Sequence, residues 1–434
     1  MKLAVKYNDS WMFQKIVGQH GISPAKLKSI QVKRLRAHKS VVKLLDSGEQ
    51  GFIKTLSDSK ELALINKWSG VLKKNFSQIL LIGIGGSDLG ARALNQAFSS
   101  SNKKQVFFLG DTADPVEIEK VFAQIDWGKC AIIPVSKSGN TVETISVFLF
   151  ARNKLVKVVG KTKHAKHVFV LTENKPSVFL NIANQQGYNI IPHPLNIGGR
   201  WTVLSIVGLL SAAFVGVDIK ALRKGARDFY NQAMKFANNP AMKYAALHYL
   251  GAKQGQSLAV LMPYSSRLEA FGAWYRQLFA ESLGKAKNRK GKSGNIGLTP
   301  IVAIGPKDQH SQVQLYNEGP FDKLVTFIRV ENSNLLSKVP KHWPGEDDIA
   351  YLDNWPYQDM LNIEQESTAK ALKNHKRPSG TISIPEISEY SVGQLFVFFE
   401  LACIYLAELF DINAFDQPGV EQGKEWMRKK LNKK

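Results

Sequence analysis

The sequence predicts an α/β protein built from two three-layer α/β/α sandwiches whose sheets are mainly parallel. Short apolar runs recur along the 434 residues, and helix-length polar or amphipathic stretches separate them. Runs that are apolar on both faces are typical of parallel strands that helices cover on both sides. The length of the chain also suits two domains.

The apolar runs divide between the two halves of the chain. The predicted strands are 79–84, 106–109, 131–135, 168–171, 189–192, 258–262, 299–304, 324–330 and 381–384. We expect a helical N-terminal arm over residues 1–45, a first sandwich over 46–215, and a second sandwich with a C-terminal helix over 216–434. In such sheets ligands collect where strands end and helices begin, so we expect the site in the loops after these strands.

Two strongly apolar segments resemble membrane spans, and we interpret both as buried core helices. Residues 201–217 are too few to cross a bilayer comfortably. Residues 395–410 are interrupted by Glu400 and Glu408. The N-terminus has no apolar run long enough for a signal peptide, so we expect no membrane association. Cys130 and Cys403 both have apolar neighbours, which favours free buried thiols and a cytoplasmic location.

The chain is strongly basic, with 58 Lys and Arg against 36 Asp and Glu and a formal charge of +22. Such a balance attracts anions in general. The densest clusters, 285–292 and 428–434, lack the interleaved aromatic residues of a single-strand binder. We therefore predict a solvated basic surface and no specific nucleic-acid site.

A glycine-rich loop follows the first strong strand, at 82–90. Its glycines allow close approach of a ligand to the backbone near Gly86, and Ser87 opens the next helix, whose free N–H groups favour an anion. The loop lacks the third glycine of a dinucleotide fingerprint, and no Gly-Lys-Ser/Thr follows it. A plain turn in which Ser87 caps the helix stays open as the alternative.

Hydroxyl side chains crowd a second loop, between the strand 131–135 and the next helix. They are Ser136, Ser138, Thr141 and Thr144, with Lys137 among them. Hydroxyls together with backbone amides form a neutral cage that suits a phosphate monoester. A hydroxyl-rich helix cap is the alternative.

Three basic side chains later in the chain are candidates for catalysis. Arg200 follows two glycines and precedes an uncharged segment, so its planar fork could stabilise an oxyanion in a cleft. His310 follows the strand 299–304 and suits proton transfer near neutral pH. Lys424 follows a Pro-Gly kink in the segment 416–424. The alternative for Arg200 is a purely structural role, in which its guanidinium donates hydrogen bonds to carbonyl oxygens. His310 has no second His or Cys at ligand spacing, so we expect no metal site.

Glu281 is the candidate base. It stands near the end of an amphipathic helix that is rich in aromatic residues, and Gln277 lies one turn before it. An apolar setting makes a carboxylate a better base toward a carbon-bound proton. By itself this pattern also fits an exposed helix glutamate.

Taken in order, these motifs resemble the glucose-6-phosphate isomerase family of the bacterial type. The segments 266–285 and 417–424 resemble its two signature blocks. The resemblance implies two sugar-isomerase (SIS) type sandwiches, reversible isomerisation of glucose 6-phosphate and fructose 6-phosphate through a cis-enediol, no cofactor, and a homodimer in which His310 serves the partner's site.

The resemblance also implies the role of each candidate residue. Glu281 would move the proton, Arg200 would stabilise the enediol intermediate, and His310 and Lys424 would assist ring opening. Gln277 and Gln417 would position the sugar. The phosphate would be bound by Gly86, Ser87, Ser136, Lys137, Ser138, Thr141 and Thr144.

The chain departs from the family's common pattern in the hydroxyl loop, where Asn140 stands in place of one hydroxyl residue. Three alternatives remain open at this stage. They are an isomerase for another sugar phosphate such as mannose 6-phosphate, a catalytically silent SIS sensor of sugar phosphates, and a basic protein that binds nucleic acid or anionic surfaces.

Overall fold

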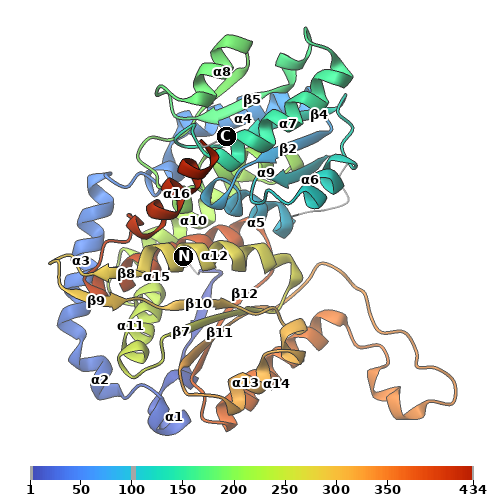
Figure 1. The fold of residues 1–434 in the computed structure, drawn as a ribbon. Coiled ribbons are helices and arrows are strands. Elements are labelled where there is room, and N and C mark those ends of the chain that lie inside the picture. Colours follow the sequence, from blue (N-terminus) through green and yellow to red (C-terminus); the bar gives the residue numbers. More distant parts are fainter. Residues whose placement is uncertain (1–2, 99–103, 433–434) are drawn as a thin grey trace.

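The chain folds into two lobes, each with its own sheet, and a layer of helices lies between the sheets (Figure 1). The structure is a computed structural model that describes residues 3–98 and 104–432. The predicted α/β class with mainly parallel sheets is confirmed.

The first sheet forms from the apolar runs in the first half of the chain. Its strands are β2 (Gln78–Ile82), β3 (Gln105–Leu109), β4 (Cys130–Pro134), β5 (Phe169–Thr172) and β6 (Asn189–Pro192). Three of these strands pair in the order β3-β2-β4, and β5 pairs with β6. Isolated parallel bridges between residues at β4 and residues at β5 connect the two groups of strands into one layer. Every strand pair is parallel.

Helices cover both faces of this sheet because alternate side chains enter different cores. In β2, Leu80 and Ile82 pack with α6 (Pro115–Phe122), α7 (Val142–Val159) and α8 (Val178–Gln186). Ile79 and Leu81 face the opposite side, with α4 (Ser59–Asn75), α5 (Leu89–Phe98) and α9 (Ile206–Val215). This two-sided burial explains why the strand is apolar at every position from Ile79 onward.

The second sheet has the order β1-β12-β11-β7-β10, and only its edge strand β1 is antiparallel among the pairs described. Its strands are β1 (Lys6–Asn8), β7 (Leu258–Pro263), β10 (Thr299–Val302), β11 (Lys323–Val330) and β12 (Ser379–Ile384). Helices α13 (Val313–Glu318) and α14 (Tyr357–Asn374) pack on its outer face.

The central helices join the two lobes through one hydrophobic core. They include α3 (Gln31–Ser47), α10 (Ile219–Ala233), α11 (Pro240–Lys253), α12 (Glu269–Leu283) and α15 (Glu389–Phe410). The predicted burial of both core helices is confirmed, because α9 and α15 are almost wholly buried. The first helix is shorter than the predicted segment 201–217, since a 3-10 helix (Gly199–Trp201) and a turn precede α9. Among the described residues, α15 alone is long and apolar enough to cross a membrane, and 94% of its most apolar window is buried inside the fold.

The sequence did not predict every element. The N-terminal segment contains the helices α1 (Gln14–Val17) and α2 (Pro24–Ser29), as predicted for a helical arm, but also the strand β1, which was not predicted and extends the second sheet. The basic cluster 285–292 begins a hairpin of β8 (Lys285–Lys287) and β9 (Ser293–Ile296). Lys433 and Lys434 of the basic tail lie outside the described residues. The division of the chain at residues 45 and 215 stays a prediction.

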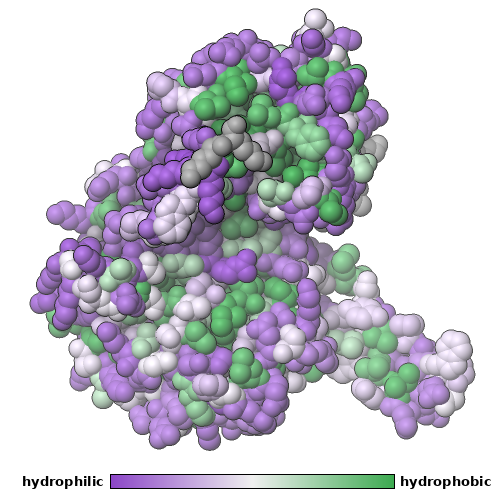
Figure 2. Space-filling model, viewed as in Figure 1, coloured by the Kyte–Doolittle hydropathy of each residue, from purple (hydrophilic) through white to green (hydrophobic). Residues whose placement is uncertain are grey.

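A long excursion between β11 and α14 projects from the lower lobe (Figure 2). It carries one short 3-10 helix (Asp347–Leu352), and large apolar side chains on it are exposed to solvent. The exposed fractions are 89% for Leu336 and 76% for Trp343. The last helix, α16 (Glu421–Leu431), has no buried residue. Neither segment is stabilised by a core of its own.

A buried ion pair links α4 to α10 beside the start of α9. The Arg223 guanidinium donates to the Glu61 carboxylate at 2.6 Å, and only 4% and 10% of these side chains are exposed. Glu61 also accepts from the backbone N–H of Ile206, the first residue of α9. Removal of one partner leaves a buried charge without compensation, which is costly.

We therefore expect Arg223→Met to lower the free energy of unfolding by about 3 kcal/mol. The matched control is Lys224→Met, which removes the neighbouring charge from the exposed side of the same helix. Chemical denaturation of the two variants measures the difference. Equal effects of the two substitutions would show that the buried pair does not stabilise the fold.

Candidate active site

The glycine loop after β2 lies directly against the turn that carries Arg200. Gly85 has a φ of +59°, and a Cβ added to Gly86 would lie 2.1 Å from the carbonyl carbon of Gly199. The Thr202 hydroxyl donates to the carbonyl oxygens of both Gly86 and Gly199, at 3.0 and 2.7 Å. A side chain on Gly86 would separate the two segments, so the sequence needs glycine here.

The hydroxyl loop connects β4 to α7 and lies beside the glycine loop, because β2 and β4 are parallel neighbours. Ser136 is buried, and its hydroxyl contacts the Thr141 hydroxyl at 2.8 Å and accepts from the Gly139 N–H at 3.1 Å. Thr141 precedes α7, where a threonine hydroxyl usually caps the helix. Here its hydroxyl is paired with Ser136 instead, and no side chain of the described residues caps α7.

The uncapped end of α7 can therefore bind an anion. Its first backbone N–H groups have no partner within the helix, and the positive end of the helix dipole lies there. The Thr144 side chain is completely buried in this first turn, and its hydroxyl oxygen has no hydrogen-bond partner among the described residues. Both features are typical of a site that an acceptor-rich group such as a phosphate completes.

Two further predicted phosphate residues, Lys137 and Ser138, lie in the loop that leads to this helix end, whereas Ser87 ends a 3-10 helix (Gly85–Ser87) and α5 begins only at Leu89. The Lys137 ammonium group donates to the carbonyl oxygen of Ile197 at 2.9 Å and lies 3.8 Å from Glu173. Ser138 is exposed on the loop, and its hydroxyl accepts from the Asn140 N–H at 3.3 Å. Lys137 thus connects the hydroxyl loop to the segment that leads to Arg200.

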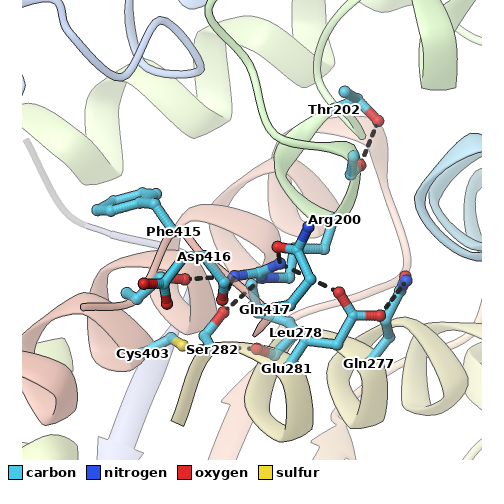
Figure 3. Close-up of polar contacts among 12 residues, drawn as sticks. Arg200, Thr202, Gln277, Leu278, Glu281, Ser282, Cys403, Phe415, Asp416 and Gln417 are labelled. Carbon is cyan, nitrogen blue, oxygen red and sulfur yellow. Dashed lines mark hydrogen bonds and ion pairs between the residues drawn. The ribbon is translucent and has the colours of Figure 1, made fainter. Parts of the chain in front are cut away.

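Arg200 lies at the centre of the polar contacts in Figure 3, and its side chain is only 3% exposed. Its Nε donates to the Ser282 hydroxyl at 2.7 Å. One terminal nitrogen donates to Glu281 at 3.1 Å and to Gln417 at 2.8 Å. The other donates to the carbonyl oxygens of Ala414 and Asp416. An arginine has five N–H donors, so every donor of Arg200 has an acceptor.

Glu281 is fixed from two sides. Its carboxylate contacts Arg200 through one oxygen and accepts from the Gln277 side-chain amide through the other, at 3.0 Å. Gln277 in turn lies against the glycine loop, since a Cβ on Gly85 would be 2.7 Å from its Nε2. The other amide atom of Gln277, Oε1, is buried with no hydrogen-bond partner in the described part of the chain.

The surroundings of Glu281 differ from the sequence-based expectation. Its side chain is 31% exposed and has polar partners. The apolar residues expected to surround it are fully buried in the central core: Phe271, Trp274, Leu278 and Phe279. The amphipathic pattern therefore reports how α12 packs, and the carboxylate emerges at the polar end of the helix.

His310 and Lys424 are not brought to this cluster within one chain. His310 is exposed at the end of a 3-10 helix (Lys307–His310). It lies near Glu364 of α14, where its positive charge opposes the burial that raises the pKa of that carboxyl. Lys424 forms an ion pair with Glu421 at 3.0 Å on the exposed helix α16.

Sequence reasoning missed residues that hold the site together. Ser282 accepts from Arg200 and is completely buried. Lys285 donates to the carbonyl oxygens of Glu281 and Asp416, at 2.6 and 2.9 Å. Thr202 connects the two glycine turns. The sequence offered only one indication for Ser282 and Thr202, which is that they lie within two residues of Glu281 and Arg200. The described residues contain no group of three or more His, Cys, Asp or Glu side chains arranged to hold a metal ion.

The fold and this site define a class: two α/β lobes with mainly parallel sheets, an uncapped helix end after a strand of the first sheet, and a carboxylate fixed near the neighbouring glycine loop. Comparison with known proteins gives the family. The phosphoglucose isomerase family profile matches residues 49–434, so the chain belongs to that family. A glucose-6-phosphate isomerase of Carboxydothermus hydrogenoformans is 34% identical over 98% of this chain and 94% of its own.

Solved structures agree with the fold. A hypothetical protein of Thermus thermophilus superposes with a TM-score of 0.87 at 32% identity, over 98% of this chain and 99% of its own. A glucose-6-phosphate isomerase of Chlamydia trachomatis superposes with a TM-score of 0.85 over 99% of this chain and 88% of its own. At 21% identity, the second match supports the fold alone.

The contact between Gly86 and Gly199 gives a direct test of the site's assembly. We expect Gly86→Ala to push the glycine loop away from Arg200, and to weaken sugar-phosphate binding about tenfold or more. The matched control is Gly70→Ala, since Gly70 lies in α4 and a Cβ there meets no atom within 4 Å. Titration calorimetry compares the variants. Unchanged binding by Gly86→Ala would contradict the described packing.

Proposed function

We propose that this chain catalyses the reversible isomerisation of glucose 6-phosphate and fructose 6-phosphate. One observation carries the proposal: the Glu281 carboxylate is fixed by Arg200 and Gln277 near the glycine loop, and the hydroxyl loop follows the neighbouring parallel strand. Aldose–ketose isomerisation of a sugar phosphate requires a site that binds the phosphate and a general base at a fixed position. Membership of the phosphoglucose isomerase family and the names of the relatives support it.

In this proposal the open end of α7 binds the substrate phosphate. The backbone N–H groups of its first turn donate to phosphate oxygens, and Ser138 and Thr141 donate from the loop. Ser136 keeps Thr141 turned away from the cap position, at a hydroxyl distance of 2.8 Å. Ser87 and the backbone at Gly86 approach from the neighbouring loop, Thr144 contributes from the first turn, and Lys137 adds positive charge.

Glu281 then moves one proton between adjacent carbons. It removes the proton from C2 of the open-chain aldose while the C1 carbonyl oxygen takes up a different proton, and a cis-enediol forms. The C2 proton then returns from Glu281 to C1, and the C2 hydroxyl releases its own proton as it becomes the ketone, so the proton gained at the C1 oxygen is balanced by the one lost from the C2 oxygen. No electrons leave the substrate, so the chemistry needs no redox partner. Gln277 and Gln417 position the sugar, and His310 and Lys424 move protons on the ring oxygens.

Arg200 stabilises the developing negative charge through its fixed fork. Its donors are all used in the present arrangement, so a substrate oxygen must replace one acceptor. Gln417 is the acceptor that can leave most easily, because its side chain is on an exposed segment. Glu281 keeps its contact with Arg200 and therefore its position during this exchange.

The proposed base is tested by Glu281→Gln, which keeps the shape of the side chain and removes its basicity. We expect kcat to fall by about a thousandfold in an assay coupled to fructose 6-phosphate formation. The matched control is Glu269→Gln, at the other end of α12, which should keep full activity. Full activity in Glu281→Gln would exclude the proposed role. A panel including mannose 6-phosphate measures the preference for the sugar.

We also propose that the protein works as a homodimer in which His310 serves the partner's site. His310 is exposed, and its side chain has no hydrogen bond among the described residues. It lies near α14, into which the projecting excursion leads. Leu336 and Trp343 of the excursion expose large apolar surfaces, which in soluble proteins mark interaction sites. A second copy of the chain would cover them.

Mixing two inactive variants tests this arrangement. Glu281→Gln and His310→Ala are each expected to be inactive, but their hybrid dimer would hold one intact site if His310 crosses the interface. After exchange of subunits, about a quarter of the wild-type activity should return. No recovery, in a mixture that contains hybrid dimers by mass analysis, would place His310 in its own chain's site.

The proposed reaction belongs to the interconversion of hexose phosphates in glycolysis and gluconeogenesis, and we propose a cytoplasmic location. The buried free thiols support it, because both Cys130 and Cys403 are unpaired.

A further inference from the structure

The hydroxyl loop is attached to a second helix end as well as to α7. The backbone N–H of Val178, the first residue of α8, donates to the Asn140 side-chain oxygen at 3.0 Å. The next N–H, of Phe179, donates to the carbonyl oxygen of Gly139 at 3.1 Å. The third, of Leu180, donates to the Ser177 hydroxyl at 3.3 Å. The loop thus supplies two of the three caps of α8.

The two helices that meet this loop differ in whether the backbone N–H groups of their first turns have acceptors. All three first-turn N–H groups of α8 have acceptors. The first turn of α7 has no side-chain cap in the described part of the chain, because the Thr141 hydroxyl pairs with Ser136. An incoming anion therefore finds free donors at α7 and none at α8. Asn140 closes one helix end while the other stays open.

The loop is also packed closely against the segment before α8. Gly139 has a φ of +66°, and a Cβ there would lie 2.2 Å from the Ser177 hydroxyl. Two backbone bonds hold the loop's start, from Ser136 N–H to Leu171 at 3.1 Å and from Glu173 N–H to Lys137 at 3.3 Å. Asn140 provides the only side-chain bond from the loop to α8 among the described residues.

We infer that Asn140 is a positioning residue for phosphate binding: it fastens the hydroxyl loop to α8 and so presets the donors around the open end of α7. The inference rests on the proposed function, in which this loop binds the substrate phosphate. A loop that is ordered in advance loses less entropy on binding, so its affinity for phosphate is higher.

The test is Asn140→Ala in the full-length protein. We expect the KM for glucose 6-phosphate and the dissociation constant of inorganic phosphate to rise together by about tenfold. We expect kcat to stay within about twofold, because Glu281 and Arg200 are not connected to Asn140. This split between KM and kcat distinguishes a role in phosphate binding from general damage to the fold.

The matched control is Ser177→Ala, which removes a cap of the same helix without detaching the loop. It should lower the melting temperature about as much as Asn140→Ala and leave the phosphate affinity unchanged. Phosphate affinity within about twofold of wild type in Asn140→Ala, or an equal loss in Ser177→Ala, would overturn the inference.

Calorimetry with inorganic phosphate separates this inference from the proposed function. A protein that binds phosphate through an Asn140-dependent site, but does not isomerise sugar phosphates, would refute the proposed reaction and keep the role of Asn140. An active isomerase whose phosphate affinity does not change in Asn140→Ala would refute this inference and leave the proposed reaction intact.

Discussion

The buried guanidinium of Arg200 is the constraint on which the arrangement of the site depends. A charged side chain that is only 3% exposed must have its donors satisfied, since an unsatisfied buried donor is expensive. The five acceptors come from α12 and from the segment 414–417. Satisfying one side chain therefore fixes the position of Glu281 and ties the C-terminal segment to the core.

The two ends of the proposed substrate site are built differently. The phosphate end consists of loops after strands of the first sheet, held by backbone bonds, close glycine packing and the Asn140 cap. The sugar end depends on side chains, with Glu281 held by α12 and Lys424 on an exposed helix. A rigid anion site next to more adjustable groups suits a substrate that must open its ring and change shape while its phosphate stays bound.

The sequence predicted the strands and the loops well because their signals are local. A buried parallel strand such as β2 must be apolar along its buried length, and the loops that follow such strands carry the ligand-binding residues. What it missed depends on distant partners. The strand β1 is defined only by pairing with β12, far along the chain. Similarly, the saturation of Arg200 and the cap from Asn140 to Val178 involve residues that no periodicity connects. Glu281 was found, but its polar surroundings were not, because the apolar pattern of α12 describes the buried side of the helix.

In the proposed function Arg200 organises catalysis and does not bind the phosphate. The direct measurement is the kcat and the inorganic phosphate affinity of Arg200→Lys, which keeps the charge and loses the planar fork. We expect kcat to fall by about a hundredfold or more while the phosphate affinity changes by less than about twofold. A kcat close to wild type, or a loss of phosphate binding in proportion to kcat, would contradict it.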